Sequence, residues 1–385
     1  MSTSLPPFAN NVSRRTVLLG AGAAALALQT QWAHAARWNG YRDAVVIDGL
    51  GGPGSLTSQP GAPLGDADLK NVRDSGLTAV LVTIEPVGTT APDAAFASAV
   101  QGMLDWDREI TRHPDTFMRI RAAADIATAK KAGRTGLIYG FQDGVAFETD
   151  LERLVDLHQL GLRVVQPTYN RRNLLGDGCM ETANAGLSRT GVEAIERLNS
   201  LGILVDLSHC GRQTAADAIR VSKRPIAFTH TGCAALVDHP RHRTDEELRA
   251  VANKGGVSGV FFMPYLSGGK QPTAADVVRH LEHMIDVAGE DHTSIGTDGT
   301  ISPAVLDQKY KDAFADTTRK RKEAGIAAPG ETEDGYLFAN DLNTPRRLET
   351  LAQMLADKGH SATRIEKILG RNLMRVFSET WTATG

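Results

Sequence analysis

The feature of this sequence that most constrains its fold is an alternation of short apolar runs with longer helical patterns. The runs are rich in Val, Ile, Leu and Ala, which is typical of strands buried on both faces of a parallel sheet. Several helical segments end at a glycine (Gly161, Gly202 or Gly289), where helix C-caps are expected. The expected strands are Ala44–Leu50, Thr78–Ile84, Gly136–Phe141, Arg163–Tyr169, Ile203–His209, Pro225–His230, Gly256–Phe262 and His292–Asp298.

Eight such strands, each followed by a helix, favour an α/β fold of the closed (β/α)₈ barrel type over an open doubly wound sheet. No Gly-x-Gly-x-x-Gly phosphate loop opens a helix after the first strand, where "DGLGGPGS" runs into Pro and Ser. A nucleotide-binding sheet is therefore the weaker interpretation. After the eighth strand we expect a polar insert, Gly299–Asn340, and two helices, Thr344–Lys358 and Ser361–Phe377. The barrel with these helices is expected to form one domain, residues 36–385.

Residues 1–35 have the pattern of a twin-arginine secretory signal. Ser13-Arg14-Arg15-Thr16 precedes an apolar run, Val17–Leu28, and Ala33-His34-Ala35 offers small residues for cleavage. An anchoring helix is the alternative, but this run is shorter than the roughly 20 residues that a membrane span needs. We therefore expect export to the periplasm or the medium, without a membrane span.

Charge and cysteine content exclude several classes of function. The formal net charge is −3 and the chain has no basic block, which argues against a nucleic-acid partner. The three cysteines, Cys179, Cys210 and Cys233, are too few for a disulfide framework and lack the C-x-x-C spacing of a structural zinc site.

Four polar residues are expected at one rim of the barrel, because functional residues of such barrels lie at the carboxyl ends of the strands. His209 ends the fifth strand, His230 the sixth and Asp298 the eighth, while Asp143 follows the third. Imidazole and carboxylate groups together suit zinc or a similar divalent ion. Each residue also has a structural interpretation, as a buried histidine bonded to a carbonyl or as an Asx turn before a glycine.

The stretch Arg171–Ile219, "RRNLLGDGCMETANAGLSRTGVEAIERLNSLGILVDLSHCGRQTAADAI", resembles the membrane dipeptidase family, also called renal dipeptidase or peptidase family M19. The likeness continues through "PIAFTHTG", "DHTSIGTDG" and "KILGRNLMRVF", and it covers most of the chain from about Asp143 onward. It implies a (β/α)₈ barrel with two bridged zinc ions that hydrolyses dipeptides. It also implies that a homodimer is to be expected, as is common in the family.

The resemblance assigns a role to each residue at the rim. His209 and His230 match two histidines that bind one zinc ion, and Asp298 matches the aspartate that shuttles the proton beside the metal. Asp143 stands at the position of a glutamate that bridges both ions, and is shorter by one methylene.

Two further positions are implied to contact the substrate. Arg241 in "DHPRH" matches an arginine that holds the substrate carboxylate. Tyr169 in "PTYN" stands where the family has a histidine that contacts the scissile carbonyl, and its phenol can still donate a hydrogen bond.

The first strand departs from the family. There "D-G-H-x-D" supplies a histidine and an aspartate to the second zinc, whereas this chain has Leu50 and Gly52 at those positions. We therefore expect one zinc, held by His209, His230 and Asp143, and a zinc-activated water that cleaves a dipeptide or another small amide. The alternative is a catalytically decayed or repurposed protein that acts in the binding or maturation of a secreted peptide product.

Overall fold

The computed structural model describes residues 38–55, 62–84, 87–88 and 91–382. The predicted signal peptide, residues 1–35, lies outside these ranges. The chain divides into a unit of Met1–Asn39 and a unit of Gly40–Gly385, and the strands and α-helices described here belong to the second unit.

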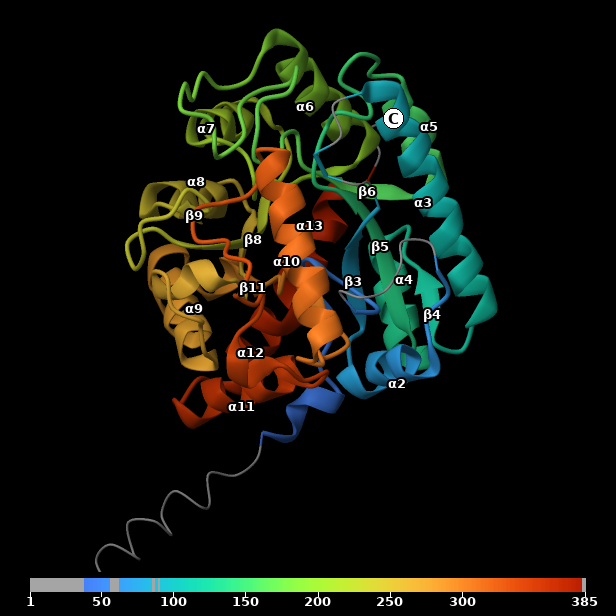
Figure 1. The fold of residues 1–385 in the computed structure, drawn as a ribbon, viewed down its shortest axis with the longest axis vertical. Coiled ribbons are helices and arrows are strands. Elements are labelled where there is room, and N and C mark those ends of the chain that lie inside the picture. Colours follow the sequence, from blue (N-terminus) through green and yellow to red (C-terminus); the bar gives the residue numbers. More distant parts are fainter. Residues whose placement is uncertain (1–37, 56–61, 85–86, 89–90, 383–385) are drawn as a thin grey trace, which may run out of the picture. The chain divides into compact units, whose positions relative to one another are not determined.

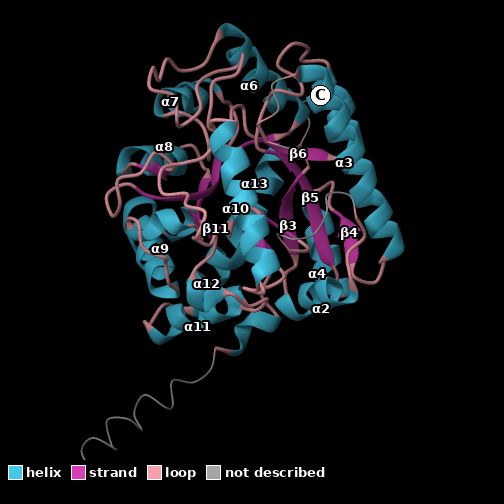
Figure 2. Ribbon diagram, viewed as in Figure 1, coloured by secondary structure: helices cyan, strands magenta, loops and turns pink. Residues whose placement is uncertain are grey.

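Parallel strands lie inside, with helices around them (Figures 1 and 2). An Asp206–Ala227 bridge joins β7 to β8, and the amide of Gly49 donates to the carbonyl of Ile295 at 2.9 Å, next to β1 and β11. The sheet thus closes into the predicted (β/α)₈ barrel. Its strands, in order around it, are β1 (Ile47–Asp48), β3 (Ala79–Thr83), β5 (Thr135–Phe141), β6 (Leu162–Val165), β7 (Leu204–Val205), β8 (Ala227–Cys233), β10 (Val257–Val260) and β11 (Thr293–Ile295).

Each of the eight strands overlaps a predicted run, because residues such as those of β3, Ala-Val-Leu-Val-Thr, are almost fully buried in the sheet. Three strands extend past the predicted bounds: β5 begins at Thr135, β6 begins at Leu162 and β8 continues to Cys233. Four further short strands lie outside the predicted runs. These are β2 (Gly51–Gly52), β4 (Phe117–Arg119), β9 (His242–Arg243) and β12 (Gly299–Thr300).

The barrel strands form two hydrogen-bonded groups, β1-β3-β5-β6-β7 and β11-β10-β8. A buried aspartate links the two groups at each of the two junctions between them. Between β1 and β11, the carboxylate of Asp48 accepts from the amide and the hydroxyl of Thr297, both at 2.7 Å. Between β7 and β8, the carboxylate of Asp206 accepts from the amide of Thr229 at 3.0 Å and from its hydroxyl at 2.6 Å. The same pair of aspartate–threonine hydrogen bonds is therefore made at both junctions.

The helices cover the strands, and no helix in the described part of the chain is long and apolar enough to cross a bilayer. A capping box fixes the start of the helix Asp245–Asn253. The hydroxyl of Thr244 accepts from the amide of Glu247, and the carboxylate of Glu247 accepts from the amide of Thr244. The helices around the barrel are α2 (Asp66–Ser75), α3 (Pro92–Arg112), α4 (Ala123–Ala132), α5 (Arg153–Leu160), α6 (Arg189–Leu201), α7 (Arg212–Val221), α8 (Asp245–Asn253) and α9 (Ala274–Ala288).

The predicted polar insert contains a sixteen-residue helix, α10 (Gln308–Glu323), drawn in orange in front of the strands in Figure 1. The chain then forms α11 (Arg347–Asp357), α12 (Ala362–Glu366) and α13 (Asn372–Thr380). A single helix over Ser361–Phe377 was predicted, and this is wrong, because a π-helical turn with a break at Gly370 separates α12 from α13. A Cβ at Gly370 would lie 2.4 Å from the carbonyl oxygen of Val45, so the close approach to the first strand explains the break.

The last helix covers the amino-terminal end of the strands. Leu373, Val376 and Phe377 of α13 belong to a buried apolar cluster that includes Ala227 and Val257, the first residues of β8 and β10. The opposite end of the barrel, where the strands finish, is left for the insert and the polar residues.

Candidate active site

Two histidines meet at the carboxyl-terminal end of the barrel. His209 follows β7 and His230 lies in β8, so neighbouring strands place them side by side. Their Nε2 atoms are 3.1 Å apart, and both side chains are buried. The structure thus brings together two of the three residues predicted to bind a metal.

Neighbouring groups fix the tautomer of His209. Its Nδ1 lies 2.6 Å from Oδ1 of Asn170, and Nδ2 of Asn170 donates to the carbonyl of Ile326 at 2.7 Å. Because the amide is oriented by that second bond, its oxygen faces the ring and accepts the Nδ1 proton. Nε2 of His209 therefore carries a lone pair.

His230 is held in the same tautomer. Its Nδ1 lies 2.9 Å from the hydroxyl of Thr229, which donates its own proton to Asp206 and so accepts from the ring. Burial, followed by the charge of Arg241, lowers the pKa of both histidines well below the usual range. Two unprotonated Nε2 atoms consequently point at one another, and they supply two of the three or more protein ligands that a zinc site needs.

Asp143 lies apart from this pair. Its Oδ1 accepts from Nδ2 of Asn173 and from the amide of Gly144, each at 2.8 Å. Burial raises its pKa to about 6, even though both donors oppose the shift. Within the described ranges, no three His, Cys, Asp or Glu side chains are grouped closely enough to hold a metal. The predicted set of His209, His230 and Asp143 is therefore not assembled here.

Asp298, the predicted proton shuttle, follows β11 in the left-handed backbone region, with φ of 55°, which is uncommon for residues other than glycine. Its amide donates to the carbonyl of Leu50 at 2.8 Å, which fixes the turn against the first strand. Burial raises the pKa of its carboxyl to about 6, although Arg241 and Arg321 oppose the shift. A carboxyl with such a pKa can exchange protons near neutral pH.

Arg241, predicted to hold a substrate carboxylate, is only 2% exposed. One terminal nitrogen donates to the carbonyl of His230 at 3.3 Å, and the guanidinium lies over the ring of Phe261. Its Nε is buried and has no hydrogen-bond partner among the described residues. A buried cation with an unused donor beside the histidines is suited to an anionic group of a ligand.

Tyr169 stacks on His209 with the ring centroids 4.1 Å apart. Its hydroxyl accepts from Nη1 of Arg321 at 3.1 Å, so its own proton remains available to a carbonyl. Burial raises the pKa of this phenol, which keeps it protonated. The residue is thus placed beside the histidine pair, as its expected role requires.

The sequence analysis missed Arg321 and Glu331, which belong to the polar insert. Nε and Nη2 of Arg321 donate to the two carboxylate oxygens of Glu331 at 2.8 and 2.9 Å. Glu331 also accepts from the hydroxyl of Tyr265 at 2.8 Å. Although burial opposes it, Arg321 lowers the pKa of Glu331. No motif marks these residues, whereas Asn170, also missed, stands directly after Tyr169 in "PTYN".

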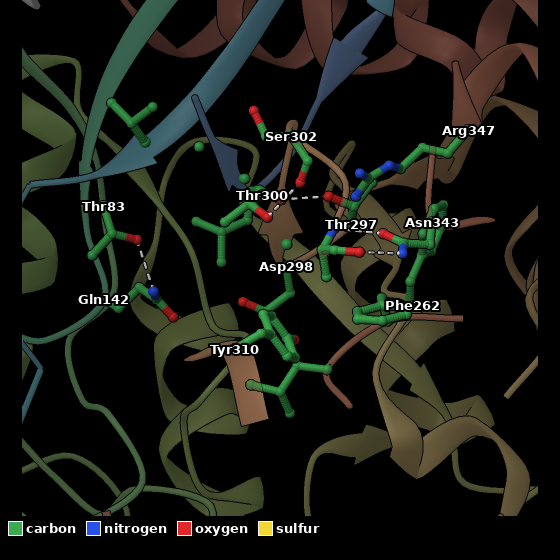
Figure 3. A pocket seen from close by; sticks show the side chains of 18 of the residues that line it. Thr83, Gln142, Phe262, Thr297, Asp298, Thr300, Ser302, Tyr310, Asn343 and Arg347 are labelled. Carbon is green, nitrogen blue, oxygen red and sulfur yellow. Dashed lines mark hydrogen bonds between the residues drawn. The ribbon is translucent and has the colours of Figure 1, made fainter. Parts of the chain in front are cut away.

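The residues at the second-metal position do not fit an ion. Leu50 is a buried aliphatic side chain, and Gly52 has none. Both line a cavity together with Asp298 (Figure 3). Since neither can donate an electron pair to a cation, no second zinc is assigned here.

Comparison with known proteins agrees with this architecture. "Dipeptidase verJ" of Clonostachys rogersoniana is 29% identical over 49% of this chain, which spans about half (49%) of that relative's length. A structure titled as an amidohydrolase from Pseudomonas aeruginosa is 31% identical, with a TM-score of 0.75 over 89% of this chain and 98% of that one.

A metallo peptidase from Rhodobacter sphaeroides, solved with a phosphinate mimic of the dipeptide L-Ala-D-Ala, shares the fold at 21% identity. Its TM-score is 0.69 over 88% of this chain and 99% of that one. The sequence model of the family described as "Membrane dipeptidase (Peptidase family M19)" matches residues 54–321, more than half of the chain, beginning two residues after Gly52. The chain therefore belongs to the membrane dipeptidase family of metallopeptidases.

Proposed function

We propose that this protein hydrolyses a dipeptide or a closely related small amide with the help of one zinc ion. The observation that carries the proposal is the convergence of His209 and His230, whose Nε2 lone pairs meet at 3.1 Å while both Nδ1 protons are engaged elsewhere. A zinc ion held there would polarise the scissile carbonyl and make a water molecule more acidic.

Asp298, Arg241 and Tyr169 each have a separate role in the proposed reaction. Asp298 takes a proton from the attacking water and returns it to the leaving amine as the carbon–nitrogen bond breaks. Arg241 holds the carboxylate of the substrate, and its unpartnered Nε supports this role. Tyr169 donates a hydrogen bond from its hydroxyl to the carbonyl oxygen and keeps its proton.

The substrate class follows from the family and from the site. One member of the same fold binds a dipeptide mimic, and a curated relative is named as a dipeptidase. The buried guanidinium of Arg241, whose Nε has no partner among the described residues, suits a terminal carboxylate of the substrate. The signal pattern of residues 1–35 supports export, so we place this reaction outside the cytoplasm.

Zinc content and dipeptide hydrolysis, measured on the same preparation, test the proposal. We expect about one zinc per chain, and loss of both zinc and activity in His209→Ala and His230→Ala. His158→Ala, a histidine of α5 remote from the pair, is the matched control and should retain both. Stoichiometric zinc in either site variant would contradict the assignment.

Asp298→Asn separates chemistry from metal binding. This variant should keep its zinc and lose about 10²- to 10⁴-fold in kcat, the range expected for a general acid–base. Folded wild-type protein that binds zinc but cleaves no dipeptide would instead favour a binding or maturation role.

A further inference from the structure

A cavity of about 280 Å³ lies beside Asp298, over the ends of β11, β1, β3 and β5 (Figure 3). An engineered apolar cavity of about 150 Å³ is enough to bind benzene, so this one has room for an aromatic or branched aliphatic group. Its apolar walls are made by Leu50, Val82, Trp106, Phe262, Tyr310 and Phe338.

The two residues that depart from the family motif both line the cavity. Leu50 contributes an aliphatic wall at the position of a metal-binding histidine. Gly52 leaves open space at the position of the aspartate, since a Cβ built on it would have no atom within 4 Å. An aliphatic side chain and an open space therefore stand where the family has two metal ligands.

The insert completes the cavity from the other side. Tyr310 comes from α10, and Phe338 from the segment that follows it. Phe338 stacks on Tyr336 with centroids 5.5 Å apart, and Tyr336 lies 6.3 Å from Tyr310, which ties the aromatic residues into one wall. A wall of this kind recognises apolar groups by burial and ring contact.

Most polar groups of the lining already have partners inside the protein. Thr83 accepts from Gln142 at 2.7 Å, Asn343 exchanges two hydrogen bonds with the backbone of Ala304, and Arg347 donates to two backbone carbonyls. The side chain of Asp298 also lines the cavity. Because most of the other polar groups of the lining are already hydrogen-bonded, the cavity favours an apolar group next to the carboxylate of Asp298.

We infer that this cavity binds a large apolar group on the amino-terminal side of the scissile amide, an inference that rests on the proposed function. The histidine pair and Arg241 lie at the β7 and β8 side of the barrel, whereas the cavity lies over β11, β1, β3 and β5. A substrate whose carboxylate is at Arg241 directs its other end into the cavity. The favoured substrates are dipeptides with Phe, Leu or a similar first residue, or amino acids with an apolar N-acyl group.

The first experiment compares three substrates: Phe-Ala, Ala-Ala and N-(3-phenylpropanoyl)-Ala. Since one methylene in an apolar pocket changes kcat/KM about 10- to 200-fold, we expect Phe-Ala to exceed Ala-Ala by at least about tenfold. Comparable cleavage of the phenylpropanoyl compound identifies an acyl pocket, and its rejection identifies a dipeptide site. Equal kcat/KM for Phe-Ala and Ala-Ala would overturn the inference.

Filling the cavity tests its location. Gly52→Ala and Gly52→Leu should reduce the Phe-Ala to Ala-Ala ratio stepwise, by about tenfold or more for leucine, because the open space at this position becomes occupied. Val305→Leu enlarges an apolar side chain at an exposed position of the insert and should leave the ratio unchanged. A ratio that is the same in Gly52→Leu and wild type would mean that the group binds elsewhere.

A binding measurement separates this inference from the proposed hydrolysis. Phenylalaninamide and alaninamide are titrated against chelator-treated protein and followed by ligand-observed NMR, for the wild type and for Gly52→Leu. Preferential binding of phenylalaninamide that Gly52→Leu abolishes supports the apolar cavity even if no dipeptide is cleaved. Hydrolysis without such binding, and without a preference for Phe-Ala, leaves the proposed function standing and removes this inference.

Discussion

Arg321 of the insert donates a hydrogen bond of 3.1 Å to the hydroxyl of Tyr169, the residue that stacks on His209. The insert helix α10 is thereby connected to the ring of a predicted metal ligand through one intervening side chain. The ion pair of Arg321 with Glu331 holds the guanidinium in place. The polar insert is thus part of the site and also one wall of its cavity.

Replacement of Arg321 by Met should destabilise the protein. Its partner Glu331 is nearly buried, and removing one member of a buried ion pair costs about 3 kcal/mol in free energy of unfolding. Urea unfolding measures this change. Arg319→Met removes an exposed pair with Asp316 on the same helix and should cost much less, because exposed ion pairs contribute little to stability. Equal losses of unfolding free energy in the two variants would contradict the stabilising role of the buried Arg321–Glu331 pair.

Thr229→Val should weaken zinc binding without removing either histidine. The hydroxyl of Thr229 orients His230 and donates to Asp206, and loss of such a supporting contact lowers metal affinity about 10- to 100-fold. Competition with a chromogenic chelator measures the affinity. Thr229→Ser keeps the hydroxyl and should have the wild-type zinc affinity. Thr135→Val, at the start of β5, should also leave the zinc affinity unchanged. An affinity of Thr229→Ser as low as that of Thr229→Val would contradict the proposed orientation of His230 by this hydroxyl.

Leu50→His combined with Gly52→Asp should raise the zinc content from about one toward two per chain. The open space at Gly52 accepts a side chain, and the new imidazole and carboxylate are both zinc ligands. Elemental analysis after dialysis gives the stoichiometry. Leu50→Ala with Gly52→Ala is the matched control and should stay at about one; an unchanged value in the His/Asp variant would show that the first-strand backbone cannot present these ligands.

Asp48 should make stability depend on pH. Burial raises the pKa of Asp48 to about 6, above its ordinary value of 3.8, so its contribution is fully present below about pH 4 and is lost as the pH rises through 6. In Asp48→Asn the fall in unfolding free energy between pH 4 and 6 should be shallower, by up to about 1.4 kcal/mol per pH unit.

Urea titrations at several pH values give these slopes, and the comparison of slopes is independent of any constant loss from the new amide. Asp115→Asn, at an exposed position, should keep the wild-type slope. A wild-type slope in Asp48→Asn would show that this carboxyl does not titrate in the window.

The barrel could be predicted from the sequence because its strands are continuous apolar runs whose burial does not depend on distant partners. The meeting of His209 and His230 followed from strand order alone. Asp143 could not be placed in the same way, since its position depends on Asn173 and on the loop that carries it. Strand order says nothing about such loop contacts.

The contacts of the polar insert could not be predicted from the sequence either. Arg321 and Glu331 meet only when α10 lies over the barrel, and nothing in a polar segment shows which surface it covers. The break at Gly370 likewise results from contact with Val45, more than 300 residues earlier in the chain, which helical periodicity cannot reveal.

The junctions made by Asp48 and Asp206 divide the barrel into two half-barrels, of five strands and of three. Each threonine that they bind stands immediately before a site residue, His230 or Asp298. His230 and Asp298 therefore lie at the two junctions of the barrel, where an aspartate carboxylate that binds the amide and the hydroxyl of a threonine supplements the few backbone hydrogen bonds between the strands. A substitution at one of these junctions can therefore change the distance between His230 and Asp298 while the hydrophobic interior of each half-barrel is unchanged.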